Sequence, residues 1–510
     1  MAQYILAHDI GTTGNKATVY DVQGKLIASS YDEYPCNYFG NNCAEQDPID
    51  WWNAICSSTR KVLGTPGISP KEISCVSFSG HMMGCVAVDK DANPLRPAII
   101  WADSRSVDQA QRLIDKVGME DGYKITGHRL LPMYSAAKIM WIMDNEPDIF
   151  RETYKFLHTK DFIVAKMTGK FVTDYSDASG MNLLDLKTRD WSEPLIKASR
   201  IPVEVLPEVH PSTYIAGGVT RKASGETGLA VGTPVVIGGG DGPCAAVGAG
   251  VVSEGSAYNY FGSAAWIGIS TGEPLYDPEM RTFVFIHLDP DLYMPTGASN
   301  NGGYSYQWFG DAVWTLEKKI LEDLGSNIYN LMEKKAERIH RGASKLLFLP
   351  YIRGERCPYD NANARGAFIG LNPNHTKADL TRAVLEGVAF NQRIILDALE
   401  GLGGKIGKDM WVIGGGAQSP LWRQIMADIY DKRIIQPRIL QEATSLGAAV
   451  AGGVGTGLFE NFAAAEKMIE AVNVHEPDPV AHADYNKLYE VFKSAYDKVE
   501  TIFGELAELS

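Results

Sequence analysis

The stretch Tyr4–Asp21, YILAHDIGTTGNKATVYD, has the pattern of a β-hairpin with an unusual turn. Tyr4–His8 is a short apolar run, DIGTTG is rich in glycine and threonine, and Lys16–Asp21 alternates like a strand. A second turn at Gln23-Gly24 leads into another strand candidate. A P-loop would join a strand to a helix and read G-x-x-x-x-G-K-[ST], which this chain lacks, so the turn belongs to a different phosphate-binding class or to none.

The hairpin pattern recurs in the second half of the chain. Ala257–Phe261 and Trp266–Ser270 are strand candidates on either side of the small-residue turn Gly262-Ser263-Ala264. The repetition suggests an internal duplication.

A literal repeat supports this interpretation, because VIGGG occurs at Val236–Gly240 and again at Val412–Gly416. Each copy ends a β-branched run and precedes a predicted helix with proline at its first position, Pro243 or Pro420. Two hairpins and two strand–GGG–helix units predict two related α/β domains. We expect them to cover residues 1–252 and 253–510.

Composition narrows the function classes. The 510 residues carry 48 Lys and Arg against 62 Asp and Glu, a formal charge of −14 that argues against nucleic acid or an anionic membrane as partner. Seven scattered cysteines without a C-x-x-C pair, and no signal peptide, indicate a cytoplasmic protein. Ala443–Phe459 is uncharged but glycine-rich, and we expect a buried helix ending at Gly452 or Gly453 rather than a membrane span.

Helix-start signals appear at several places. Asp47-Pro48 precedes an amphipathic run, and Thr376–Asp379 resembles a capping box. A C-terminal amphipathic helix near residues 480–508 is predicted to dock onto a domain.

The first turn has groups suited to phosphate. A tight turn presents several backbone N–H groups, Thr12 and Thr13 add hydroxyls, and Lys16 adds a cation. Asp9 would be poorly placed beside phosphate unless a Mg²⁺ ion lay between them. The alternative is an ordinary hairpin in which Asp9 bonds its own turn.

Asp241, in GGGDGP, follows the first VIGGG run. Beyond the carboxyl end of a strand, where open α/β sheets bind ligands, it could accept a proton from a hydroxyl. The alternative is a plain helix cap. GGGAQS, residues 414–419, has no carboxylate at the matching place. It is typical of a turn whose backbone faces a flat or phosphorylated ligand. Metalloprotease, hydrolase and dinucleotide-binding motifs are absent from the sequence.

Taken together, the motifs resemble the FGGY carbohydrate kinases, and within that family most closely the xylulokinases. The resemblance runs in order from residue 4 to about 460. It is carried by DIGTTGNK, EQDPIDWW, SFSGHMMG, LRPAIIWADSR, VIGGGDG, GERCPYD, AVLEGVAF and VIGGGAQSPLWRQIMAD. It implies two ribonuclease-H-like domains of the actin and hexokinase superfamily, with ATP and sugar bound in the cleft between them.

The resemblance also implies roles for residues that match the motifs. Asp241 takes the position of the catalytic base, and Asp9 is the carboxylate associated with Mg²⁺ and activity. The sugar side comprises Met82, Met83, Trp101, Asp103 and Tyr134. The nucleotide side comprises Thr12, Thr13, Lys16, Gly262, Ser263, Gly303, Gly415, Gly416 and Ala417.

Two positions depart from the xylulokinase pattern. That pattern has Met-His where this chain has Met82-Met83, and Asp-Asn where it has Asp241-Gly242. Both changes remove polar groups expected to face sugar hydroxyls. Glycerol kinases have Arg-Glu at the first pair, while Tyr134 matches a tyrosine on their polyol side.

We therefore expect an ATP- and Mg²⁺-dependent kinase that converts D-xylulose to D-xylulose 5-phosphate. Another ketose, a polyol or a sugar acid is the alternative substrate. An actin-like ATPase without a sugar substrate and a degenerate sugar-binding regulator are the alternatives of other classes. Asp9 and Asp241 are both present, which argues against a degenerate site. The sequence leaves the oligomeric state open, and a homodimer is one alternative.

Overall fold

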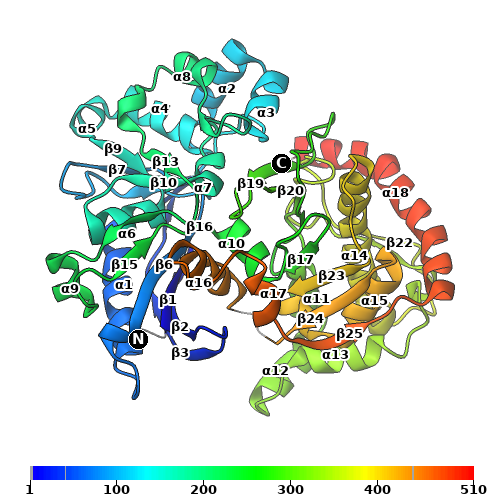
Figure 1. The fold of residues 1–510 in the computed structure, drawn as a ribbon. Helices are drawn as coiled ribbons and strands as arrows, with labels where there is room; N and C mark the ends of the chain where they lie inside the picture. The colour runs from blue at the N-terminus through cyan, green and yellow to red at the C-terminus, as the bar shows by residue number, and fades with distance from the viewer. Residues whose placement is uncertain (1–3, 41, 439–441, 510) are drawn as a thin grey trace.

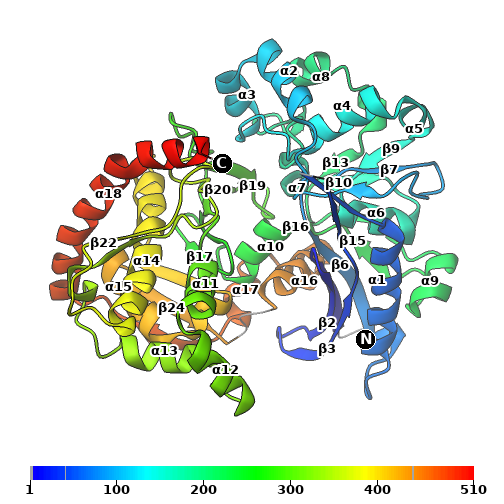
Figure 2. The ribbon, with the colours of Figure 1, turned by 180° about the vertical axis from the view of Figure 1, so that it is seen from behind.

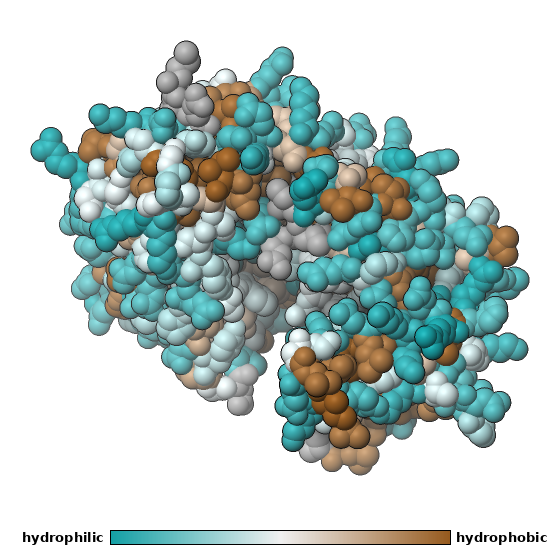
Figure 3. All heavy atoms as spheres, turned by 90° about the horizontal axis from the view of Figure 1, so that it is seen from below, coloured by the Kyte–Doolittle hydropathy of each residue, from teal (hydrophilic) through white to brown (hydrophobic). Residues whose placement is uncertain are grey.

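The computed structural model describes residues 4–40, 42–438 and 442–509. They form two lobes, each built on a mixed sheet, and Figures 1 and 2 show the lobes side by side from opposite sides. Seen from below, the surface is notched between the lobes, and hydrophilic side chains cover most of it (Figure 3).

The sheet of the first lobe has the strand order β14-β15-β6-β1-β2-β3, with β16 also paired to β6. β1 runs antiparallel to β2 and parallel to β6, which places the predicted hairpin at the sheet's centre. The strands are β1 Tyr4–Ile10, β2 Gly14–Asp21, β3 Leu26–Glu33, β6 Ile73–Gly80, β14 Ile215–Gly218, β15 Pro234–Val236 and β16 Gly239–Gly240.

The sheet of the second lobe has the order β19-β20-β18-β17-β23-β24-β25. Here too a hairpin is flanked by two parallel strands and an antiparallel edge strand. The strands are β17 Ala257–Phe261, β18 Ala265–Ile269, β19 Phe283–Ile286, β20 Tyr293–Ser299, β23 Asp409–Ile413, β24 Arg433–Pro437 and β25 Ala471–His475. The predicted hairpins and the duplicated α/β architecture are confirmed.

The two VIGGG runs, however, are not equivalent, contrary to the interpretation that they mark matching units. The first follows β15, which lies two places from the hairpin strand β1. The second ends β23, which lies directly beside the hairpin strand β17. The strand that matches β23 is therefore β6, and β15 matches β24. Strand order identifies the true counterparts, whereas a five-residue string does not.

Helices surround the sheets, and the helix starts predicted at Asp47-Pro48 and at Thr376 have the expected caps. α1 (Pro48–Leu63) begins with Asp47 accepting from Ile49 N, and α14 (Lys377–Gly401) begins with a complete capping box. α18 (Pro479–Glu508) packs along the second lobe through Tyr485, Tyr489 and Phe492.

The remaining elements form small additions around these layers. The other helices are α2 Val107–Val117, α3 Met119–Thr126, α4 Ser135–Asn145, α5 Pro147–Glu152, α6 Thr159–Thr168, α7 Tyr175–Ser179, α8 Glu193–Ser199, α9 Arg221–Thr227, α11 Gly303–Val313, α12 Thr315–Asp323, α13 Ile328–Ala336, α15 Pro420–Tyr430 and α17 Ala464–Met468. The short strands are β4 Asn37–Phe39, β5 Cys43–Gln46, β7 Val86–Val88, β8 Ala98–Ile99, β9 Lys155–Leu157, β10 Val172–Asp174, β11 Leu184–Asp185, β12 Asp190–Trp191, β13 Glu208–His210, β21 Leu347–Leu349 and β22 Ala367–Ile369.

Two helices in backbone contact lie between the lobes, α10 (Asp241–Gly248) and α16 (Ala443–Gly455) (Figure 1). A Cβ atom on Gly248 would lie 1.7 Å from the carbonyl oxygen of Ala443, and one on Gly447 would lie 1.9 Å from that of Cys244. Only glycine permits this approach.

α16 also packs on the first lobe's sheet, where Leu446 and Val450 share a core with Ile5. The predicted buried helix is thus confirmed, although it ends at Gly455 rather than at Gly452 or Gly453. Within the described ranges, we find no helix whose length and apolarity would let it cross a bilayer.

Candidate active site

Two carboxylates meet at one edge of the first sheet. In the parallel pairing, Asp9 of β1 is opposite Ser79 of β6, and Ser79 is opposite Gly239 of β16. Asp241 directly follows β16, which ends at Gly240. The carboxyl ends of three neighbouring strands therefore bring Asp9 and Asp241 together, at the edge where α/β sheets bind ligands.

Burial raises the pKa values of both groups, and the charge of Asp9 adds to the rise at Asp241. The pKa of Asp241 rises to about 7, chiefly because of burial and then because of the charge on Asp9. The pKa of Asp9 rises to about 6 through burial, while the neighbouring Ser79 side chain and the charge of Lys16 oppose the rise. Neighbouring carboxylates with raised pKa values near neutrality are typical of acid–base sites and of sites that bind cations.

Asp241 is the first residue of α10, and Gly240 is the cap. Pro243 is therefore the third helical residue, and its predicted place at the first position is wrong; Pro420 does open α15, after the cap Ser419. One carboxylate oxygen of Asp241 accepts from Gly242 N at 2.8 Å. Asp241 thus lies at the positive end of a helix and remains half-buried at the surface between the lobes.

The first turn, between β1 and β2, carries the predicted phosphate-binding groups. Thr12 Oγ1 accepts from the indole N–H of Trp101 at 2.9 Å, and Thr13 Oγ1 lies 3.1 Å from the hydroxyl of Tyr31. Lys16 Nζ lies 3.5 Å from Glu442 Oε1, across the interface between the lobes. Trp101 is 40% exposed, so its ring is accessible beside the turn.

Met82 and Met83 follow the end of β6. The side chains of both approach Gly180, and both belong to an apolar cluster with Phe283 and Phe285 of the second lobe. Met82 is buried, whereas Met83 is half-buried and has a left-handed φ of 62°. These two residues form an apolar wall near Asp241, because Met82 Sδ would lie 2.4 Å from a Cβ placed on Gly240.

Asp103 does not face the cleft. It is fully buried, and its carboxylate accepts from Ala44 N at 2.6 Å and from the guanidinium of Arg105 at 2.7–3.0 Å. The predicted direct contact with sugar therefore lacks support from the geometry, because the carboxylate is saturated by protein donors. Asp103 instead fixes the loop that carries Trp101.

Tyr134 is buried at the start of α4, and its hydroxyl lies 3.0 Å from His128 Nδ1. His128 in turn packs against Phe283 and Phe285 of β19. Burial raises the pKa of Tyr134 to about 12, although the charges of Arg356 and Arg129 oppose the rise. Tyr134 thus lies where the first lobe contacts the second, with two arginines nearby.

A cavity of about 610 Å³ lies in the second lobe. Five of the predicted nucleotide-side residues line it: Gly262, Ser263, Gly303, Gly415 and Gly416. Aromatic side chains of α11, α13 and α15 also line it: Tyr306, Tyr329 and Trp422.

The turn Gly262-Ser263 packs directly on the N-terminus of α11, where Gly303 N donates to Gly262 O at 2.7 Å. Backbone N–H groups at a turn and at a helix start suit phosphate oxygens. Ala417 is an exception among the predicted residues. It is fully buried, and its carbonyl accepts from Arg423. Ala417 therefore supports the turn at Gly415 and Gly416 and does not line the cavity.

Comparison with known proteins agrees with this arrangement. The family model for the N-terminal domain of the FGGY family of carbohydrate kinases matches residues 4–248, and the model for the C-terminal domain matches residues 257–456. The chain belongs to the FGGY family of carbohydrate kinases.

Individual relatives span the whole chain. The kinase is 32% identical to a gluconokinase of Bacillus licheniformis, over 99% of this chain and 98% of the relative. It is 30% identical to a xylulose kinase of Bacillus subtilis (strain 168), over 97% of each. The crystal structure of xylulose kinase from Rhodospirillum rubrum superposes with a TM-score of 0.91 at 27% identity, covering 98% of this chain and all of that one. The protein is thus an ATP-dependent sugar kinase.

Sequence reasoning missed several residues of the kinase's site. Ser79 lies beside Asp9 because of strand pairing, and the cavity's aromatic residues come from separate elements. Ser79 falls within the SFSGHMMG motif, so the motif contained a signal for it. Trp422 likewise falls within VIGGGAQSPLWRQIMAD, whereas no motif contained Tyr306 or Tyr329.

Proposed function

We propose that the kinase transfers the γ-phosphoryl group of ATP to the terminal hydroxyl of D-xylulose, with Asp241 as general base. The convergence of Asp9 and Asp241 beside the Thr12 turn is the observation that carries the proposal. Phosphoryl transfer depends mainly on alignment and charge stabilisation, and two glycine-rich turns from different lobes supply both.

Asp241 is suited to the proton transfer. A base works best when its pKa lies near the operating pH, and the pKa of Asp241 is raised to about 7. The sugar hydroxyl would approach between Asp241 and the apolar wall of Met82 and Met83. Trp101 would cover the same sugar from the side of the first turn.

The two carboxylates also fit a divalent cation. Burial raises the pKa values of both carboxyl groups, and the charge of Asp9 raises that of Asp241 further, so an ion of opposite charge would stabilise both ionised groups. Asp9 is the residue that would hold Mg²⁺, which prefers one or two carboxylates together with phosphate oxygens. Bound there, Mg²⁺ would neutralise charge on the phosphates. Asp9→Ala should weaken Mg²⁺ binding measured by calorimetry and leave metal-free sugar binding unchanged.

A sugar acid such as D-gluconate is the second candidate substrate. The charges of Arg129 and Arg356 act on Tyr134 from the two lobes, and a substrate carboxylate would find favourable potential there. Both arginines have protein partners, since Arg129 pairs with Asp360 and Arg356 Nε donates to Ala298 O at 3.3 Å. A polyol is compatible with the Tyr134 hydroxyl.

A screen of ADP release with ketoses, polyols and sugar acids tests the proposal. The proposal predicts the highest kcat/KM with D-xylulose. A preference for D-gluconate that falls selectively in Arg356→Met would establish the second candidate instead. ATP hydrolysis that no sugar accelerates would indicate an actin-like ATPase, and sugar binding without turnover would indicate a regulator.

The cellular setting follows from the same proposal. The kinase would consume ATP and release a phosphorylated sugar. Such an enzyme fits the cytoplasm, where ATP is available. The chain's net charge of −14 also disfavours nucleic acid and anionic membranes as partners. A homodimer is compatible with this assignment, and light scattering would measure it.

A further inference from the structure

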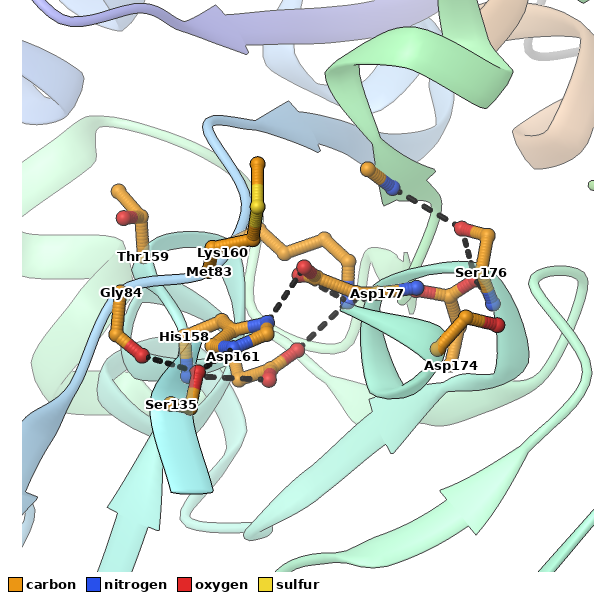
Figure 4. A network of polar contacts seen from close by, with 12 residues as sticks. Met83, Gly84, Ser135, His158, Thr159, Lys160, Asp161, Asp174, Ser176 and Asp177 are labelled. Atoms are coloured by element: carbon orange, nitrogen blue, oxygen red, sulfur yellow. Dashed lines mark hydrogen bonds and ion pairs between the residues drawn. The ribbon is translucent and has the colours of Figure 1, made fainter. Parts of the chain in front are cut away.

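A fully buried lysine lies behind the catalytic edge of the first sheet. Lys160 Nζ is 2.6 Å from Asp161 Oδ1, 2.9 Å from Asp174 Oδ1 and 3.4 Å from Asp177 Oδ2, and none of these side chains is accessible (Figure 4). Three carboxylates around one cation resemble a metal site. The ammonium group already occupies the place that an ion would take, so Lys160 serves as the cation of this cluster.

One arm of the cluster reaches the residue before Asp241. Asp174 Oδ2 accepts from the Ser176 hydroxyl at 2.5 Å, and Ser176 Oγ accepts from Gly240 N at 3.0 Å (Figure 4). Because the Ser176 proton is directed to Asp174, its oxygen is oriented to receive the Gly240 N–H. The backbone position from which Asp241 starts is thus fixed by a buried charge.

A second arm reaches the residue after Met83. Asp177 Oδ1 contacts His158 Nδ1, His158 Nε2 lies 2.8 Å from Ser135 Oγ, and Ser135 Oγ donates to Gly84 O at 2.7 Å. The Ser135 hydroxyl donates its hydrogen bond to Gly84 O, and the His158 ring links that hydroxyl to the Asp177 carboxylate. This arm therefore connects the buried cluster to the backbone beside Met83.

We propose that Lys160 and its carboxylates form a positioning network that sets the geometry of the transfer through two separate arms. The Ser176 arm places the base Asp241, and the Ser135 arm places the apolar wall at Met82 and Met83. None of these residues touches substrate, so they are positioning residues. Buried networks of ion pairs and hydrogen bonds rigidify their surroundings, which is the property that such a site needs.

The network is more elaborate than packing alone requires. Burying one ammonium and three carboxylates involves a large desolvation cost, and such clusters add little net stability compared with apolar packing. The two arms end at the backbone on either side of the proposed sugar site, at Gly240 and Gly84. The inference rests on the proposed role of Asp241, whose failure would appear separately as normal turnover in Asp241→Asn.

The chain offers a matched pair of variants. Ser176 and Ser212 both donate to Asp174 Oδ2, at 2.5 and 2.9 Å, but the Ser176 hydroxyl also accepts the N–H that precedes Asp241. Ser176→Ala should lower kcat about 10- to 100-fold, the effect expected of a small misplacement, while Ser212→Ala should leave kcat within about twofold of wild type.

The split between kcat and KM supplies a second readout that a purely structural role would not change. The Ser176 hydroxyl holds the N–H of Gly240, directly before Asp241, and does not contact the wall at Met82 and Met83. Ser176→Ala should therefore lower kcat and leave the KM for the sugar close to the wild-type value, whereas general loosening of the fold would change both.

The second arm has its own test, which holds even if Ser176→Ala fails to fold. Ser135→Ala should raise the sugar KM several-fold with kcat changed less than about threefold, because only the wall is displaced. Equal kcat values in Ser176→Ala and Ser212→Ala would overturn the first arm. An unchanged sugar KM in Ser135→Ala would overturn the second.

Discussion

The indole N–H of Trp101 donates to the hydroxyl of Thr12 at 2.9 Å. This bond joins the loop fixed by Asp103 to the turn that is proposed to bind phosphate. The sugar side and the phosphate side of the first lobe are therefore mechanically connected.

Trp101→Phe keeps the aromatic surface and removes this bond. A typical hydrogen bond contributes about 0.5–1.5 kcal/mol, so kcat/KM should fall about 2- to 13-fold. Thr12→Val should have a similar effect, and the double variant should lose no more than either single one, because the two groups share one interaction. Fully additive losses would show that Trp101 and Thr12 act independently.

The ionised form of Asp241 should destabilise the folded protein. Its folded pKa, about 7, lies above the ordinary value of 3.8, so the stability it contributes is complete below pH 4 and is lost as the pH rises through 7. Asp241→Asn removes that loss. Its melting temperature should exceed the wild-type value at pH 8 and differ little at pH 4, measured by calorimetry. A gain that is the same at both pH values would contradict the raised pKa.

The pair Met83→His and Gly242→Asn restores the xylulokinase pattern. Histidine is among the residues that tolerate the left-handed φ of 62° at position 83. Gly242 has no left-handed φ, and a Cβ there would meet only Met294 Cε at 3.8 Å. Each added hydrogen bond contributes about 0.5–1.5 kcal/mol, so kcat/KM for D-xylulose should rise a few-fold to about a hundredfold. No gain would mean that other groups already make the sugar contacts.

The crossing of α10 and α16 should tolerate no side chain at Gly447. A Cβ there would lie 1.9 Å from Cys244 O, so Gly447→Ala must move one helix. Overpacking of this kind costs about 1–3 kcal/mol, which should lower the melting temperature by several degrees. Gly504→Ala, in α18 with nothing within 4 Å, is the control and should be neutral or slightly stabilising. Equal melting temperatures would contradict the close crossing.

Local signals in the sequence predicted the elements best. The Tyr4–Asp21 hairpin, the Asp47 cap and the Thr376 capping box depend on neighbouring residues, and the structure contains each of them. The VIGGG repeat predicted the right number of α/β units, although the two copies follow strands that are not equivalent in the two sheets. Which strand pairs with which depends on the whole sheet, and a short identical string carries no information about that pairing.

The site was predictable in its carboxylates and only partly in its other residues. Glycine-rich turns and the GGGDG run directed attention to Asp9 and Asp241, because their neighbours are unusual. Asp103 and Ala417 sit in motifs as well, but burial gives them supporting roles. The packing of α16 on the first sheet involves residues more than 400 positions apart, beyond any local pattern.

The central claim is that Asp241 accepts the proton of the sugar hydroxyl. Asp241→Asn keeps the size of the side chain and its place at the start of α10 but cannot take a proton. General-base catalysis contributes roughly 10²–10⁴-fold, or about 2.7–5.4 kcal/mol. Single-turnover phosphoryl transfer to the preferred sugar should therefore slow by that factor, with nucleotide affinity unchanged. Transfer at the wild-type rate in this variant would contradict the account.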